Sequence, residues 1–148
     1  MDSPLTSPLH VQAWPDPVID HLGYEPTSSY FEWLWLPRVG PSAAWAYRRL
    51  STGLDAQPDG FTVALDELAH WIGLGGTGKH SPLVRCLGRL VQFGLAVQID
   101  EYTLALRRRV PPLTQSQLGR LSPVLQRTHL RLANTATPSE QLDRATAN

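Results

Sequence analysis

Apolar residues recur at helical spacing in four segments of the chain, and polar residues occupy the opposite face of each segment. This pattern is typical of helices that pack one side against a core. The four helices are predicted at 41–54, 65–74, 82–93 and 123–133. The third and fourth each begin at a Ser–Pro pair, which supplies a capping hydroxyl and a residue suited to the first helical turn. A further short helix is predicted from Thr114, which fits a capping box with Gln117 and should end before Pro123.

Short runs of strand-forming residues lie between these helices. One run, residues 61–63, follows the first helix. Two more, at 95–100 and 102–109, follow the third helix and are divided by the acids Asp100 and Glu101, so together they predict a hairpin. The fold class expected from the whole pattern is mainly α with a small β-hairpin.

The stretch YFEWLWLP at residues 30–37 is rich in aromatic side chains. Its apolar positions fit a strand and a helix equally well, because the run is short. Pro37 is expected to end either element. Such a cluster is most often part of the core, and the alternative is a surface at residues 30–36 that binds a protein partner.

Both ends of the chain differ in composition from the middle. Residues 1–29 contain five prolines among Ser, Thr and acids, so we expect an extended or mobile, Pro-rich acidic N-terminal segment. In the last predicted helix, Val124, Leu125 and Leu132 are expected to face the core. Residues 134–148 are small and polar and are expected to be a disordered tail.

The Gly-rich connection GLGGTGKH at residues 73–80 matches the G-x-x-x-x-G-K spacing of a phosphate-binding loop. However, His80 replaces the hydroxyl residue that should follow the lysine. The segment before Gly73 also has the pattern of a helix, whereas a phosphate-binding loop follows a strand. We therefore do not expect a nucleotide hydrolase, and we interpret the connection as a turn between two helices.

The formal net charge of zero hides an uneven distribution of charge. Residues 1–37 contain five acids and no Lys or Arg, whereas residues 79–131 contain nine basic residues and two acids, a local charge of +7. A basic half on a neutral chain indicates an anionic partner, and nucleic acid is the commonest one. The alternative is a solvated surface that pairs with the acidic half of the same chain.

The order helix, short strand, helix, Gly-containing turn, helix and hairpin resembles a winged helix-turn-helix domain. The stretch LDELAHWIGLG is similar to the support helix, and SPLVRCLGRLVQFGLAV is similar to the recognition helix that leads into the wing. The resemblance covers roughly residues 40–110, and it departs from the usual pattern in the long Gly-rich turn and in Ala64 at a cap position. It implies a winged helix domain at 30–110 with extra C-terminal helices at 111–133.

The resemblance implies sequence-specific binding of double-stranded DNA by a transcriptional regulator, which often acts as a homodimer. The recognition helix of such folds enters the major groove, and the wing contacts phosphate or the minor groove. On this chain, these positions fall at the start and outer face of helix 82–93 and at the end of the second wing strand. The residues expected to contact DNA are Lys79, His80, Ser81, Arg85, Arg89, Gln92, Arg107, Arg108 and Arg109.

The alternative function is a winged-helix interaction module or adaptor that binds protein and not DNA, with the acidic N-terminal segment covering the basic face. Catalysis and cofactor binding are not expected, because no paired carboxylates or Ser–His–Asp set stands out and the histidines and Cys86 lack metal-ligand spacing. We also expect no membrane segment, because no apolar run approaches about 18 residues. The single cysteine and the absence of a signal-peptide pattern favour a cytoplasmic protein. Twelve arginines beside one lysine are typical of a GC-rich, bacterial genome.

Overall fold

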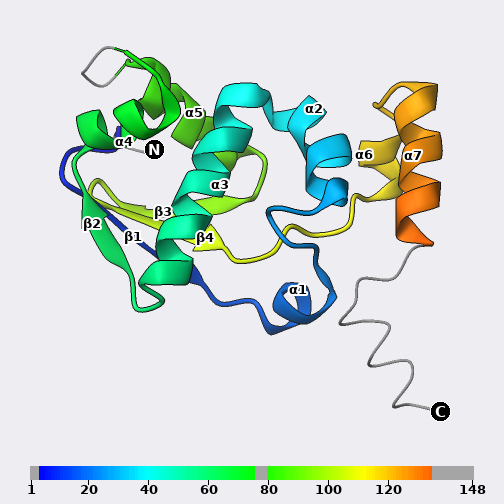
Figure 1. Cartoon of the computed structure of the whole chain (residues 1–148), viewed down its shortest axis with the longest axis horizontal. Helices are drawn as coiled ribbons and strands as arrows, with labels where there is room; N and C mark the ends of the chain where they lie inside the picture. The colour runs from blue at the N-terminus through cyan, green and yellow to red at the C-terminus, as the bar shows by residue number, and fades with distance from the viewer. Residues whose placement is uncertain (1–3, 76–79, 135–148) are drawn as a thin grey trace.

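The computed structural model describes residues 4–75 and 80–134 (Figure 1). All four predicted helices are present within two residues of their expected bounds. They are α3 (Pro41–Ala56), α4 (Leu65–Ile72), α5 (Pro82–Gln92) and α7 (Pro123–Ala133). The predicted short helix is α6 (Gln115–Leu118), and Thr114 and Gln117 form the expected capping box. The prediction of a mainly α fold is therefore confirmed.

The helix ends follow the local chemistry of the sequence. The hydroxyl oxygens of Ser81 and Ser122 accept hydrogen bonds from the third residues of α5 and α7, so both Ser–Pro pairs act as caps. Ala64 gives α4 no side-chain cap, as expected. Gly73, at φ 81°, ends α4 in the left-handed conformation that glycine adopts without steric cost.

The aromatic stretch is helical. It forms a π-helix, η1 (Phe31–Trp35), which continues into the short helix α2 (Leu36–Val39). The prediction that Pro37 ends the element is wrong, because the helical chain continues through Pro37 to Val39; Pro37 lies in the first turn of α2, where its fixed φ suits a helix. Four of the stretch's residues are buried in the core: Tyr30, Phe31, Leu34 and Trp35.

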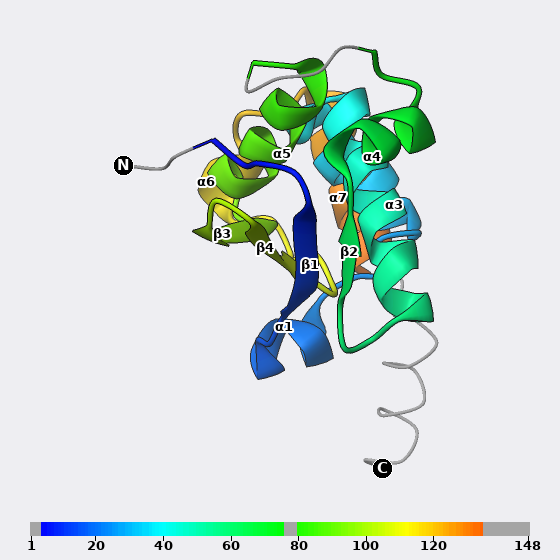
Figure 2. The same ribbon diagram turned by 90° about the vertical axis from the view of Figure 1, so that its left-hand side faces the viewer.

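A four-stranded sheet replaces the isolated hairpin (Figure 2). The predicted hairpin is present as β3 (Ala96–Asp100) and β4 (Thr103–Arg107), and β2 is Phe61–Val63. The unexpected strand is β1 (Leu9–Trp14), which lies between β2 and β4 in the order β2-β1-β4-β3. It runs antiparallel to β2 and parallel to β4.

Residues 1–29 were expected to be extended or mobile; β1 is extended but paired within a sheet, and the short helix α1 (Pro17–Leu22) departs from the expectation. Leu9 and Val11 of β1 are fully buried, whereas His10 and Gln12, which follow them in turn, are partly exposed; this is the alternation of a strand with one face on the core. Because β1 pairs with strands on both sides, the sheet crosses the domain boundary that we placed at residue 30.

One hydrophobic core joins the sheet, the helices and the C-terminal segment. Helix α3 crosses one face of the sheet (Figures 1 and 2). Three buried aromatic side chains connect η1 and α3 to the chain that leaves the sheet at β4. The Tyr47 hydroxyl donates to the Arg107 carbonyl (2.7 Å), Trp35 Nε1 donates to the Pro111 carbonyl (3.0 Å), and the Tyr30 hydroxyl accepts from the Leu113 amide (2.8 Å). These bonds satisfy the polar atoms that aromatic burial would otherwise leave unpaired.

Helix α7 packs less tightly than its pattern indicated. Leu125 and Leu132 are half-buried, but Val124 is 58% exposed, so its predicted inward position is wrong. The helix lies at the end of the molecule beside η1 (Figure 1), where it has a neighbour on one side only. Only part of its apolar surface can be covered there.

The order α3, β2, α4, α5, β3 and β4 is the order that the winged-helix resemblance implied. The insertion of β1 between β2 and β4 is an addition that the resemblance did not imply. The winged helix-turn-helix assignment therefore stays a prediction.

Candidate nucleic-acid interface

Helix α5 exposes the face that the sequence indicated. Leu83, Leu87 and Leu90 are buried against the core, so the helix can rotate little about its axis. The opposite face is exposed and consists of Arg85, Gly88, Arg89 and Gln92. Exposure of these positions is confirmed, and their contact with DNA stays a prediction.

The start of α5 is only partly available to a ligand. His80 is exposed in the turn before the helix. Ser81 is buried, and its hydroxyl oxygen accepts a hydrogen bond from the Val84 amide (3.3 Å), so its main role is to cap the helix. Lys79 lies outside the described residues.

Arg89 has a structural role that the sequence did not reveal. Its Nε donates to the Val39 carbonyl (2.8 Å) and its Nη2 donates to the Arg38 carbonyl (3.2 Å). These carbonyls belong to the last turn of α2, where backbone acceptors lack an intrahelical partner. Arg89 therefore joins the outer face of α5 to the end of α2, and within residues 4–75 and 80–134 the other three of its five N–H groups make no hydrogen bond.

Arg107 is held within the chain. Its Nη1 lies 2.7 Å from Asp16 Oδ2, its Nε donates to the Gly94 carbonyl (2.8 Å), and its guanidinium stacks 3.9 Å from the centre of the Trp14 ring. The hydrogen bond from Arg107 is the main reason that the pKa of Asp16 lies below its usual value. The side chain of Arg107 is only 15% exposed, so it is poorly placed for the DNA contact that we expected.

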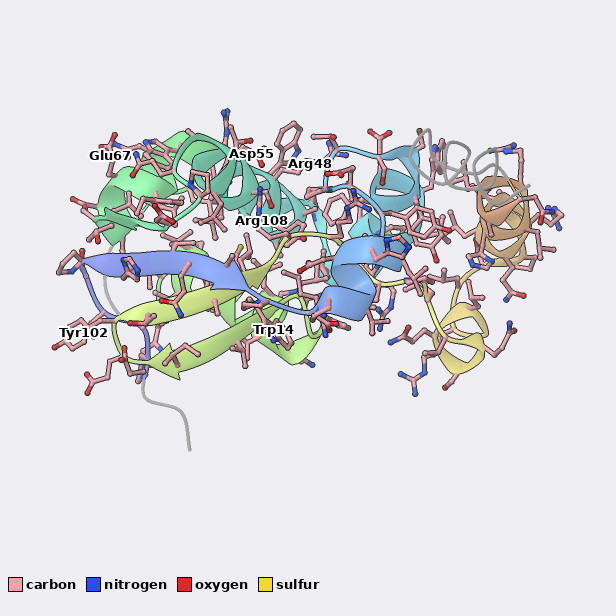
Figure 3. The ribbon with its side chains drawn as sticks, turned by 90° about the horizontal axis from the view of Figure 1, so that it is seen from below. Trp14, Arg48, Asp55, Glu67, Tyr102 and Arg108 are labelled. Atoms are coloured by element: carbon pink, nitrogen blue, oxygen red, sulfur yellow. The ribbon has the colours of Figure 1, made fainter. Side chains whose placement is uncertain are left out.

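The next two arginines also have acidic partners. Arg108 pairs with Asp55 of α3, and Figure 3 shows the two side chains together beneath that helix. Arg109 Nη2 lies 3.1 Å from Glu25 Oε1. The strand β4 ends at Arg107, so the prediction that all three arginines end a wing strand is wrong for Arg108 and Arg109, which lie in the bend that follows. The alternative that we left open, pairing of basic residues with the acidic N-terminal segment, thus holds for Arg107 and Arg109.

The tip of the β3–β4 hairpin is acidic. Asp100 and Glu101 are exposed there beside Tyr102, which Figure 3 places at the end of the sheet. The N-terminal segment is attached to this tip, because the Thr6 amide donates to the Glu101 carbonyl (2.7 Å). Carboxylates near a phosphate backbone are repulsive, so the described hairpin favours nucleic-acid contact less than α5 does.

Two further arginines were not among the predicted residues: Arg38, which lies near the exposed face of α5, and Arg120, whose charge acts on Arg38. Arg38 lies on α2, beside the end of α5, and its guanidinium is 5.2 Å from the centre of the Phe93 ring. Arg120 follows α6 and is exposed. A signal for both was available, because residues 36–54, 68–99 and 102–139 contain no Asp or Glu. The segments that carry α2, α5 and α6 therefore form an acid-free part of a chain whose net charge is zero.

Comparisons with protein-family models, with curated proteins and with solved structures found no match. Among residues 4–75 and 80–134, no three His, Cys, Asp or Glu side chains are placed so that they could bind a metal ion together. Within the same residues, every helix is too short or too polar to span a membrane.

Proposed function

We propose that this chain binds double-stranded DNA through the exposed face of α5 and acts as a transcriptional regulator. The observation that carries the proposal is the row of Arg85, Arg89 and Gln92 on a helix whose other face is fixed in the core. No acidic residue lies on α5 or on the described chain directly next to it, so nothing in that helix opposes a phosphate backbone.

The dimensions of α5 suit a major groove. The groove is about 12 Å wide and admits an α-helix. Arg85 and Gln92 are seven residues apart, which is about 10 Å along a helix at about 1.5 Å per residue. That length equals about three base-pair steps of about 3.4 Å. Arg85 can therefore donate two hydrogen bonds to a guanine edge while Gln92 pairs with an adenine about three steps away, each contributing about 1–3 kcal/mol of discrimination.

The remaining predicted residues take other roles in this proposal. His80 lies at the entrance of α5 and can contact a phosphate. Arg89, already anchored to α2, presents its free N–H groups in a fixed orientation, which lowers the entropic cost of binding. A homodimer remains part of the proposal, because paired α5 helices would read two half-sites one helical turn apart.

The experiment is selection of bound fragments from random DNA, followed by measurement of affinity at several salt concentrations. We expect an enriched sequence, and an affinity that falls with salt by a slope of about 0.9 for each phosphate neutralised. The double variant R85A/Q92A should lose sequence preference while its stability changes by no more than about 0.5 kcal/mol. Absence of binding at low salt would reject the proposal, and unchanged selectivity of R85A/Q92A would reject the assigned face.

A second candidate is the protein-interaction module. It is favoured by two exposed tryptophans, Trp33 on η1 (46% exposed) and Trp45 on α3 (51% exposed), since large exposed aromatic side chains are enriched at protein interfaces. The same salt series separates the two functions. Binding of the chain to mixed DNA without salt dependence, or no binding at all, leaves the interaction module as the better description.

A further inference from the structure

Two guanidinium groups from distant parts of the sequence meet at one aromatic ring. The Cζ atoms of Arg38 on α2 and Arg89 on α5 lie 5.2 Å and 5.4 Å from the centre of the Phe93 ring. Arg38 also lies over the Trp35 ring, at 4.8 Å. Stacking on rings orients a guanidinium and leaves its N–H edge free for a planar or tetrahedral anion.

The charge of this cluster is not compensated within the described chain. Burial lowers the pKa of Arg38 below its usual value, and the nearby charge of Arg120 lowers it further. The ion pairs formed among residues 4–75 and 80–134 involve Arg107, Arg108 and Arg109, and none of them involves Arg38, Arg89 or Arg120. Arg38 therefore has two like charges near it, Arg89 on the shared Phe93 ring and Arg120, and no described carboxylate pairs with any of the three; an anion would stabilise this arrangement.

Hydrogen-bonding capacity in the cluster is also unused. Arg38 Nη1 is buried and has no hydrogen-bond partner in the described structure, so the cost of burying this charge is not compensated, although Nη1 itself is not exposed to a ligand. Arg89 directs one edge of its guanidinium at the end of α2, and within the described residues its other three N–H groups make no hydrogen bond. A charged group that is partly desolvated and incompletely hydrogen-bonded gains more from an anion than a solvated one does.

We propose that Arg38, Arg89 and Arg120 form a phosphate-binding site that holds the DNA backbone beside the C-terminal end of α5. This proposal rests on the proposed function, because it takes the anion to be a backbone phosphate of the DNA that α5 reads. The position supports this choice: Arg89 belongs both to the cluster and to the row of Arg85 and Gln92 on α5. The cluster thus supplies affinity that is independent of base sequence, while the row supplies specificity.

The test compares the full chain with the double variant R38Q/R120Q, which keeps Arg89 and its bonds to α2. The matched control is R49Q/R127Q, which removes the same charge from two exposed positions on α3 and α7. In fluorescence anisotropy with a mixed-sequence duplex, we expect R38Q/R120Q to bind about tenfold more weakly on every sequence. The slope of log affinity against log salt should fall by about two, one for each phosphate that the variant no longer neutralises. The control R49Q/R127Q should change the affinity by less than tenfold and the salt slope by less than two.

A second measurement uses inorganic pyrophosphate and does not require DNA binding. We expect saturable shifts of the backbone amide signals of Phe93 and Arg120 in NMR spectra of the wild-type chain, and no such shifts in R38Q/R120Q. The exposed single variant R120Q should weaken binding of both ligands if the double variant fails to fold.

Each outcome separates the site from the proposed function. DNA binding with an unchanged affinity and slope in these variants overturns the phosphate site and leaves the proposed function intact. Pyrophosphate binding without DNA binding supports the anion site and rejects the proposed function. Absence of pyrophosphate shifts together with an unaltered salt slope overturns the site.

Discussion

Gly88 lies in the interior of α5 at an exposed position, where glycine is a poor helix former. A Cβ atom placed there would meet no other atom within 4 Å, so packing inside the chain does not require glycine. Glycine in a helix interior costs about 0.5–1 kcal/mol relative to alanine. We therefore predict that G88A raises the free energy of unfolding by about 0.5–1 kcal/mol, and we attribute the native glycine to close approach of a partner.

A larger side chain at position 88 tests the approach of the partner directly. Leucine is also a good helix former, so G88L should fold at least as well as the native chain. Its side chain would project between Arg85, Arg89 and Gln92 and would hold α5 away from base edges. We expect G88L to bind DNA at least tenfold more weakly, which corresponds to about 1.4 kcal/mol of binding free energy.

Urea unfolding followed by circular dichroism measures the stability, and fluorescence anisotropy with the selected DNA measures the affinity. Thermal unfolding gives a second measure of stability, because 1 kcal/mol corresponds to about 2–4 °C for a chain of this size. G88A serves as the matched control for G88L, since both changes remove the same backbone flexibility. Full DNA affinity of G88L would refute the reasoning about α5, and an unchanged stability of G88A would refute the reasoning about the helix.

Three further predictions concern the contacts that position α5 and the sheet. R89A should lower stability by about 1 kcal/mol, measured by urea unfolding, because it removes the hydrogen bonds to the end of α2; an unchanged stability would show that water replaces these bonds. Y30F should cost about 1–3 kcal/mol, because it leaves the buried Leu113 amide without an acceptor. Burial raises the pKa of Tyr30 from near 10 to about 12. The stabilisation that protonated Tyr30 gives the folded chain is therefore present below pH 10 and is lost as the pH rises towards about 12. Between these two pH values, the wild-type chain should lose stability more steeply than Y30F. Removal of residues 1–14 should abolish cooperative unfolding, because it deletes an interior strand, and a truncated chain with a native circular dichroism spectrum would contradict this prediction.

Local patterns predicted most of the helices of this fold. The Ser–Pro pairs and the capping box at Thr114 act within one turn, so their effect can be read without knowledge of distant residues. The outer face of α5 was also predictable, because helical spacing alone determines which residues oppose the buried leucines. Both the caps and the outer face of α5 depend only on residues that are close together in the sequence.

Except for α1, whose Asp16 cap and Pro17 are local signals that were missed, the main features that the sequence did not predict depend on partners that are far apart in the chain. Leu9 and Val11 alternate as in a strand, but the prolines around them indicated a loop, and their pairing partners lie on β2 and β4. The sequence around Arg107 contains no sign of its ion pair, because the partner, Asp16, is distant in the chain. The sequence therefore predicted a contact with nucleic acid instead. The contact of Arg89 with the end of α2 was not predictable either. The pattern of residues 30–37, the aromatic stretch that leads into α2, fits a strand and a helix equally well. In these three regions, contacts between distant segments determine the structure, and local sequence preference does not.

The interior position of β1 constrains how the protein can form. During synthesis, the strand that contains Val11 leaves the ribosome before its parallel neighbour, which contains Leu104, because α3, α4 and α5 lie between them in the sequence. Until then, β1 has an open edge on that side and only the short β2 to pair with. Pairing across so long a separation slows folding and leaves strand edges open to wrong partners. The apolar residues of β1 therefore stay open to wrong partners until β4 has been made.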